Sequence, residues 1–394
     1  MKLFLHIGTE KTGSTSFQRW GRINRQALAA HGVCYSQSLG PENHRKLYLW
    51  ALPPDQEDDG YAHSGLNAPA ARQVFRRTLP GQFAKEVAQA RDKGAHSFVI
   101  SNEHCHSRLT DEAALLRMRD FLAEHFDDIE ILCSLRPQID VAVSLASTWA
   151  RGFPVTRAFF DTVVPQNVYY NYLALYERWV RVFGAKRITL LPYHRDPDMS
   201  RYLLGRLGLP ETGLVVPPRQ NEALDVRVMA LANAIHAAKD KQGKVMLNNM
   251  ISKLSCTERL QPGLDRAREV QAQFAQSNAA LAQISPDLTA EDLEPDWARY
   301  NKPPNLYLLD QPCVFPDHLV EILGQYQQQS TLAQARELAA TAERALARSN
   351  PEAARDFLAQ ARKQLAALHV SDQDQLAQVE ARFAEITAQL DRYM

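Results

Sequence analysis

The chain has 394 residues, and 45% of them are hydrophobic, so we expect a packed core in one large domain plus an additional element. Lysine plus arginine and aspartate plus glutamate both number 45. The resulting net charge of zero argues against bulk nucleic-acid binding, although it leaves room for a local basic pocket.

The five cysteines form no C-x-x-C pair, which disfavours a zinc site or a disulfide framework and suits a reducing compartment. The apolar run at residues 3–7 is too short for the core of a signal peptide. No stretch approaches the roughly 20 apolar residues that a membrane span needs. We therefore expect a cytoplasmic protein that is not an integral membrane protein.

The most informative stretch is residues 3–18. An apolar run ends at Gly8, a loop of small residues contains Lys11, and a helical pattern follows. Strand, glycine loop and helix N-terminus together place backbone N–H groups around a phosphate. Gly8 and Gly13 have the spacing of a Walker A loop, but a serine stands where its lysine should be. The loop hydroxyls could bind an anion without a metal: Thr12, Ser14, Thr15 and Ser16.

Residues 15–31 show a helical stripe, and residues 33–35 look like a short strand. Residues 38–80 are rich in proline, glycine and acidic residues, and an insertion this long predicts a functional loop or a lid. His44 lies in this insertion and could face a substrate, with a surface histidine as the simpler interpretation. A helix is expected over residues 82–94.

Titratable residues follow the buried strand predicted at 97–101. Glu103, His104 and His106 lie where ligands bind in open α/β sheets, just beyond the carboxyl end of a strand. Adjacent residues at a strand end point in opposite directions, so at most one of Glu103 and His104 should face a ligand. Alternatively, this polar segment only caps the next helix.

A second strand–helix junction carries an arginine and a serine. The strand predicted at 129–135 ends at Arg136, and Ser144 follows eight residues later in a helix expected over 139–151. An arginine fork suits a phosphate dianion, and a hydroxyl on the second turn of the helix can reach the same group. Further on, the pattern predicts a helix at 171–183, a strand at 187–193 and a helix at 200–207. Helices again dominate residues 225–283.

The last segment differs in composition and has no strand pattern. Residues 331–394 predict two or three antiparallel helices, with one starting at Pro351. The final helix carries apolar residues at heptad spacing: Leu376, Val379, Phe383, Ile386 and Leu390. These helices could pack on the core, bind a partner or pair two subunits as a homodimer. We divide the chain into an α/β domain, 1–328, and a helical extension, 329–394.

Three of these motifs support a family resemblance. The loop from His6 to Gln18 resembles the phosphosulfate-binding loop of sulfotransferases that use 3′-phosphoadenosine 5′-phosphosulfate (PAPS), and it is closest to that of bacterial carbohydrate-type enzymes. Arg136 with Ser144 resembles the second signature of the family. Arg219 with Asn221 resembles a nucleotide-covering element, although Asn221 could equally cap the following helix. The resemblance spans about residues 1–325, and Glu10 departs from it, because the relatives often carry histidine there.

The resemblance implies a P-loop-like three-layer α/β fold, with a central, mostly parallel sheet flanked by helices. It also implies transfer of a sulfuryl group from PAPS, without a metal, to a hydroxyl or amine of a glycan, glycolipid or small molecule. Lys11 would then lie at the leaving oxygen, with Thr12, Gly13, Ser14, Thr15 and Ser16 at the 5′-phosphate. Arg136 and Ser144 would hold the 3′-phosphate, and Arg219 and Asn221 would contact the nucleotide. Glu103 is the first choice for the general base, followed by His104 and His106.

Two other functional classes are compatible with a phosphate-binding loop. The first is an ATP-dependent P-loop kinase or NTPase, which the displaced lysine and the lack of an obvious Walker B aspartate disfavour. The second is a non-catalytic scaffold that binds a nucleotide and acts through its helical extension. The sequence does not specify the acceptor.

Overall fold

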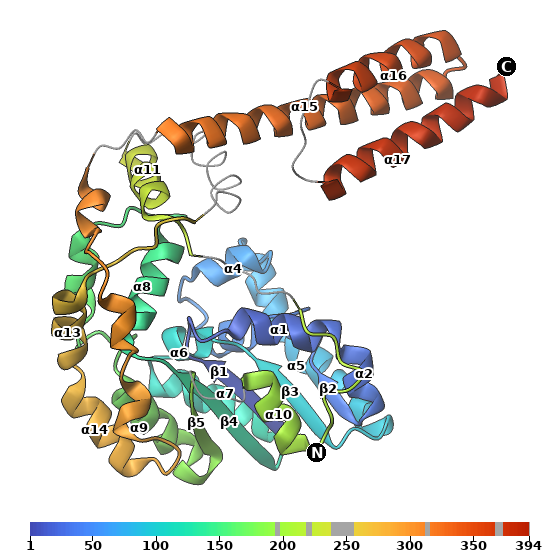
Figure 1. Ribbon diagram of the computed structural model, residues 1–394. Helices are drawn as coiled ribbons and strands as arrows, with labels where there is room; N and C mark the ends of the chain where they lie inside the picture. The colour runs from blue at the N-terminus through green and yellow to red at the C-terminus, as the bar shows by residue number, and fades with distance from the viewer. Residues whose placement is uncertain (194–197, 218–222, 238–255, 312–315, 367–372, 394) are drawn as a thin grey trace.

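The computed structural model describes the whole chain except residues 194–197, 218–222, 238–255, 312–315, 367–372 and 394 (Figure 1). Its centre is a five-stranded sheet in the order β2-β3-β1-β4-β5, and neighbouring strands pair in parallel. The strands are β1 (Lys2–Gly8), β2 (Val33–Tyr35), β3 (Ser97–Ser101), β4 (Asp128–Leu135) and β5 (Ile188–Pro192). The predicted α/β fold with a central parallel sheet is therefore confirmed.

Both faces of the sheet are covered, which explains why its strands are almost continuously apolar. Side chains alternate along β1: Leu3 and Leu5 join one apolar cluster, whereas Phe4 joins another on the opposite face. Helices α1 (Ser14–Ile23), α2 (Arg25–Ala30) and α10 (Met199–Leu207) supply the cluster around Phe4. The larger cluster on the other face comes mainly from α3 (Lys46–Ala51), α5 (Pro69–Asp92), α7 (Glu112–Ala123), α9 (Tyr172–Phe183) and α14 (Ala275–Ile284). The result is three layers.

The insertion at residues 38–80 is more helical than predicted. It contains α3, α4 (Asp59–His63) and the first half of α5, which begins at Pro69 and runs through Pro80. The apolar stripe of α5 continues across Pro80, with Phe75 and Leu79 before it and Phe83 after it, all buried. Burial of this stripe offsets the hydrogen bond that proline removes from the helix. The predicted helix over 82–94 was therefore only the second half of α5.

The helix expected over residues 15–31 is broken at Asn24. The amide side chain of Asn24 bonds both backbone groups of Val215, at 2.8 and 2.9 Å, and this contact separates α1 from α2. Such a break depends on a partner 191 residues away, so local sequence could not indicate it.

A second group of helices lies beyond the β4–β5 side of the sheet (Figure 1). Its apolar cluster includes residues of α8 (Gln138–Trp149), α11 (Val226–Ala237) and α13 (Leu264–Ala272). Short helical segments complete the chain: α6 (His104–Arg108) and the 3-10 helices η1 (Arg157–Thr162), η2 (Ala185–Arg187), η3 (Ala290–Leu293), η4 (Trp297–Tyr300), η5 (Leu306–Asp310) and η6 (Asp391–Tyr393).

The C-terminal part consists of α15 (Pro316–Ala347), α16 (Pro351–Ala366) and α17 (Gln373–Leu390), and it extends away from the sheet in Figure 1. The predicted heptad stripe of α17 packs against α15 and α16 in an apolar cluster of residues 332–390. Val379, Phe383, Ile386 and Leu390 are thus buried within the chain, and Leu376 is partly buried against the same cluster. Helix α15 runs through residue 328, and the domain boundary there stays a prediction. No described helix is long and apolar enough to cross a membrane.

Candidate active site

The glycine loop lies at the carboxyl end of β1, the middle strand of the sheet. Gly8 and Gly13 have φ values of 88° and 81°, and Lys11 between them has a φ of 67°. A Cβ atom added to Gly8 would come within 2.9 Å of Glu103 Cβ, so only glycine fits there. This close approach brings the loop and the candidate base together.

Hydroxyl groups stiffen the loop from within. Thr9 donates from its backbone N–H and its Oγ1 to the Ser134 carbonyl, at 2.7 and 3.0 Å. Thr12 and Ser14 are buried and donate to the Thr9 carbonyl at 2.5 and 3.3 Å. These two hydroxyls therefore fix the shape of the loop, whereas Thr15 is half-buried and Ser16 is exposed.

The backbone of the loop offers the anion site. The N–H groups of residues 12–15 bond to no other described residue. Helix α1 begins directly behind them, and the first N–H groups of a helix have no partner within it. A helix N-terminus also favours a negative charge. The loop therefore presents free backbone donors at a helix N-terminus, the arrangement that suits an anion.

Lys11 reaches from the loop to α8. Its Nζ donates to Thr148 Oγ1 at 2.6 Å, and Thr148 in turn donates to the Ser144 carbonyl at 3.2 Å. Burial lowers the pKa of Lys11, and the nearby cations Arg136 and Arg151 lower it further. Glu10 and Glu103 act in the opposite direction on the same pKa.

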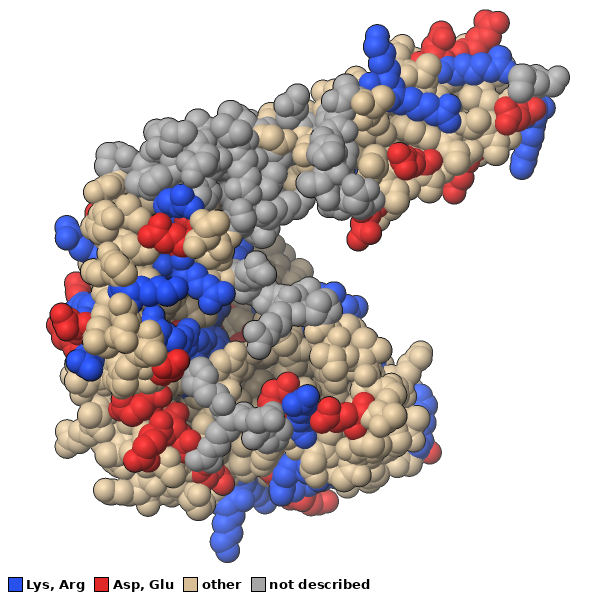
Figure 2. Space-filling model, in the orientation of Figure 1, with Lys and Arg blue, Asp and Glu red and all other residues tan. Residues whose placement is uncertain are grey.

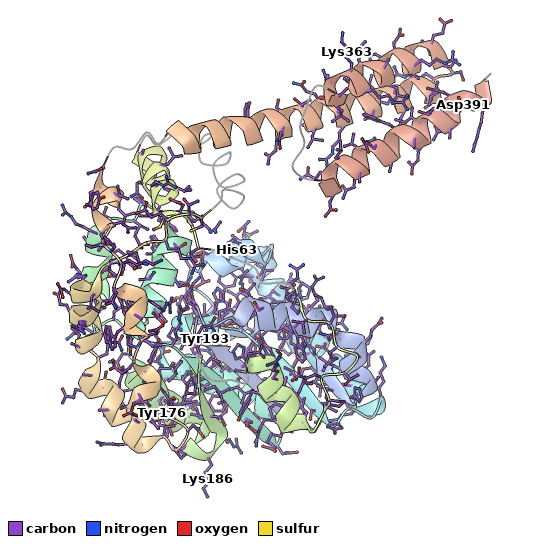
Figure 3. The ribbon with its side chains drawn as sticks, in the orientation of Figure 1. His63, Tyr176, Lys186, Tyr193, Lys363 and Asp391 are labelled. Carbon is purple, nitrogen blue, oxygen red and sulfur yellow. The ribbon has the colours of Figure 1, made fainter. Side chains whose placement is uncertain are left out.

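Arg136 lies beside the loop because β4 is the neighbour of β1 in the sheet. Its Nη1 donates to the Lys11 carbonyl at 3.2 Å, and its guanidinium lies 5.1 Å above the centre of the Tyr193 ring. Tyr193, labelled in Figure 3, follows β5 and also approaches Gly13. The structure thus brings Lys11, Arg136 and, on α8, the half-buried Ser144 to one edge of the sheet.

Figure 2 shows Lys and Arg side chains along the α8 side of a hollow in the centre of this face. This local basic region coexists with a net charge of zero for the chain. Arg219 and Asn221 lie outside the described residues, so their predicted nucleotide contacts stay predictions.

Glu103 is held by two amides that sequence reasoning did not assign. Gln18 Nε2 donates to Oε2 at 2.5 Å, and Asn43 Nδ2 lies 3.1 Å from both carboxylate oxygens. Asn43 is itself held by Asn102. Gln18 ends the loop motif and Asn43 lies in the insertion. The sequence does not indicate that both side chains contact Glu103. The Glu103 side chain is 14% exposed, so it is not sealed from solvent.

The sequence suggested that the side chains of Glu103 and His104 point in opposite directions, as at a strand end. The two residues instead lie beyond the strand. β3 already ends at Ser101, and His104 begins the short helix α6. His104 Nδ1 therefore lies 3.6 Å from Glu103 Oε1. The His104 ring stacks on Tyr48, with centroids 5.5 Å apart, and burial lowers its pKa.

Both ring nitrogens of His106 are bonded to the backbone. Its Nε2 donates to the Tyr169 carbonyl at 2.9 Å, and its Nδ1 accepts the Glu10 backbone N–H at 3.5 Å. Burial lowers the pKa of His106 to about 4. Both nitrogens are used, so His106 could accept a substrate proton only by releasing the loop. His44 is likewise fully buried, with one nitrogen bonded to the Ser101 N–H and the other to the Ser36 carbonyl.

Glu10 faces α6 and the segment before α9. Its carboxylate accepts hydrogen bonds from Ser107 Oγ and from Tyr169 OH, the latter at 3.3 Å. Together with the His106 contact, these bonds fasten the loop to α6 and to the segment before α9. The Glu10 carboxylate therefore has hydrogen-bond donors of its own within the structure.

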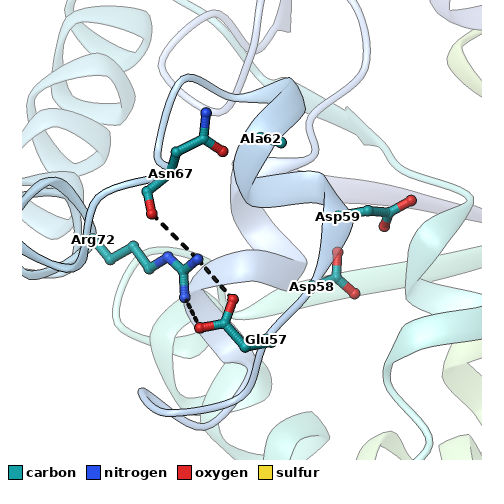
Figure 4. A pocket seen from close by; sticks show the side chains of 6 residues that line it. All are labelled: Glu57, Asp58, Asp59, Ala62, Asn67 and Arg72. Atoms are coloured by element: carbon teal, nitrogen blue, oxygen red, sulfur yellow. Dashed lines mark hydrogen bonds and ion pairs between the residues drawn. The ribbon is translucent and has the colours of Figure 1, made fainter. Parts of the chain in front are cut away.

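A separate hollow of about 410 Å³ lies beside α4 (Figure 4). None of the predicted site residues lines it; its walls are Glu57, Asp58, Asp59, Ala62, Asn67 and Arg72. Arg72 pairs with Glu57 there at 2.7 and 2.8 Å. Asp58 and Asp59 pair with Arg108 of α6, so the hollow adjoins α6, and Lys11 is not among its lining residues. Among the described residues, no group of three or more His, Cys, Asp or Glu side chains could hold a metal ion.

Comparisons with known proteins give one finding. No protein-family model matches the sequence, and no curated protein matches it significantly. Among solved structures, a sulfotransferase from Alicyclobacillus acidocaldarius is 18% identical, over 63% of this chain and 96% of that chain, with a TM-score of 0.35. A TM-score this low does not establish a shared fold, so function has to be inferred from the site.

Proposed function

We propose that the protein is a sulfotransferase that uses PAPS and modifies a hydroxyl or amine of an acceptor. One observation supports the proposal: the glycine loop and Arg136 meet at adjacent strand ends, where Arg136 donates to the Lys11 carbonyl at 3.2 Å. A nucleotide with phosphates on both its 5′ and 3′ positions needs two such elements close together. A single phosphate chain would need only the loop.

The loop suits the 5′ end of this nucleotide. The N–H groups of residues 12–15 and the N-terminus of α1 are oriented donors for a phosphate. Arg136 and Ser144 suit the 3′-phosphate, because Arg136 Nη2 has no partner among the described residues. Guanidinium groups bind phosphate through paired hydrogen bonds. When bound, the nucleotide supplies the sulfuryl group.

The chemistry then falls to residues on both sides of the loop. Glu103 takes the proton from the acceptor hydroxyl or amine, while Gln18 and Asn43 hold its carboxylate. Lys11 stabilises the negative charge that develops on the departing phosphate oxygen. Most of the rate enhancement comes from orientation and charge stabilisation, as in phosphoryl transfer. A carbohydrate or glycolipid acceptor and a cytoplasmic location complete the proposal.

Binding measurements provide the first test. We expect 3′-phosphoadenosine 5′-phosphate (PAP) to raise the melting temperature of the protein more than AMP does. A larger effect of ATP with Mg²⁺ than of PAP would contradict the proposal and favour a kinase or NTPase.

Transfer of labelled sulfate from PAPS to glycan, glycolipid and small-molecule fractions provides the second test. Lys11→Ala is the matched control and should abolish transfer. Tight PAP binding with no labelled product from any fraction would favour a nucleotide-binding scaffold. The mass of the protein in solution, with and without residues 329–394, tests pairing through the C-terminal helices.

A further inference from the structure

Asp140 is a fully buried carboxylate at the start of α8, with 0% of its side chain exposed. Its Oδ2 lies 3.6 Å from Arg136 Nε and 2.9 Å from Arg299 Nη1. Its Oδ1 accepts a hydrogen bond from Tyr300 OH at 2.5 Å. One buried carboxylate therefore connects Arg136 with a second arginine from η4, a segment that carries none of the sequence motifs.

The position of Asp140 on α8 places this cluster next to the nucleotide site. Asp140, Ser144 and Thr148 are spaced at i, i+4 and i+8, so they lie along one face of the helix. Thr148 contacts Lys11 on that face, and Ser144 lies between the two ends. The two guanidinium groups thus adjoin the same surface of α8 that reaches the glycine loop.

The charges explain why such a pair needs a ligand. A buried carboxylate is costly unless it is paired, and Asp140 is paired with two cations. The single negative charge of Asp140 balances only one of the two guanidinium groups that it contacts. The Arg299 side chain is 42% exposed, so its remaining nitrogens can reach a bound group. A phosphate dianion matches the guanidinium charge that Asp140 leaves unbalanced.

We propose that Asp140 positions Arg136 and Arg299 as a pair, and that Arg299 is a second binding residue for the 3′-phosphate of the nucleotide. This inference rests on the proposed function and adds two residues to it. Asp140 acts through the arginines and is a positioning residue. Arg299 contacts the phosphate directly.

The test compares the affinities of the full-length protein for PAP and for AMP by calorimetry, because the two nucleotides differ by the 3′-phosphate. Arg299→Gln should weaken the binding of PAP about 10-fold, the effect of losing one charge-assisted hydrogen bond, and leave the binding of AMP unchanged. Asp140→Asn should lower the ratio of the PAP affinity to the AMP affinity further, because both arginines lose the carboxylate that pairs with them. If Asp140→Asn does not fold, the exposed Arg299 variant decides the question.

Two controls separate binding from structure. Arg157→Gln removes another exposed arginine, which pairs with Asp310 at 2.6 Å, and should not change the PAP-to-AMP ratio. Tyr300→Phe removes a neutral donor to Asp140 and should have a smaller effect than Arg299→Gln. Equal effects of Tyr300→Phe and Arg299→Gln on the PAP-to-AMP ratio would overturn the inference, because Arg299 would then only support Asp140.

The outcome for the wild-type protein distinguishes the two levels of the proposal. A strong wild-type preference for PAP that survives in Arg299→Gln and Asp140→Asn overturns the inference alone. A wild-type protein that binds PAP and AMP equally overturns the proposed function, and the inference with it.

Discussion

The substitution Gly8→Ala tests how tightly the loop and the candidate base are packed. Gly8 has a φ of 88°, and a Cβ atom there would lie 2.9 Å from Glu103 Cβ and 3.1 Å from the Glu10 backbone nitrogen. An L-residue in the left-handed region costs roughly 1–2 kcal/mol. Overpacking a well-packed site adds about 1–3 kcal/mol. We therefore expect the free energy of unfolding to fall by about 2–5 kcal/mol.

Gly94→Ala is the matched control for this prediction. Gly94 has a φ of 80°, but a Cβ atom there would meet nothing within 4 Å. Its cost should therefore be the conformational part alone, roughly 1–2 kcal/mol. The difference between the two variants isolates the contact with Glu103.

Urea unfolding followed by tryptophan fluorescence is the assay. All five tryptophans lie between residues 20 and 297, so the signal reports on the α/β part and not on the C-terminal helices. Gly8→Ala should also reduce sulfuryl transfer, because displacement of Glu103 moves the base. Equal losses of stability in the two variants would refute the packing argument.

The other predictions concern the chemistry. Glu103→Gln should lower kcat by about 10²–10⁴-fold without weakening PAP, and an equal loss in His104→Gln would reassign the base. Arg136→Ala should weaken the binding of PAP roughly 10–100-fold and the binding of AMP little. An equal loss of affinity for both nucleotides would place Arg136 away from the 3′-phosphate. The proposed mechanism needs a protonated Lys11, and burial lowers the pKa of this lysine, so activity should fall as the pH rises through that pKa. Since Glu10 opposes this lowering, Glu10→Gln should move the alkaline limb of the pH–rate profile to lower pH, and an unmoved limb would contradict the assignment.

Local pattern was sufficient for the parts of the fold that depend on near neighbours. The strand that ends at Gly8 and the strand that ends at Arg136 were both predicted, because buried parallel strands are apolar and end in polar or glycine residues. Their adjacency in the sheet is what brings Arg136 to the loop. The periodicity of the two strands does not specify that adjacency, because it depends on the order of strands in the sheet.

Features that depend on distant partners were missed. The break at Asn24 needs Val215, and the passage of α5 through Pro80 needs the apolar layer around Phe83. The same holds for Glu103, whose partners Gln18 and Asn43 come from two separate segments. A single sequence shows which side chains are able to bond, but the fold decides which of them meet.

Glu10 shows how the site balances its charges. An acid beside an anion-binding loop would repel the anion if nothing else were close, yet Lys11 is buried near Arg136 and Arg151, which favour its neutral form. A neutral Lys11 could not stabilise a departing phosphate. Glu10 and Glu103 favour the charged form, and Ser107 and Tyr169 hold the Glu10 carboxylate toward α6 and the segment before α9. The acid thus favours the charged form of the lysine, while its own carboxylate is held by Ser107 and Tyr169.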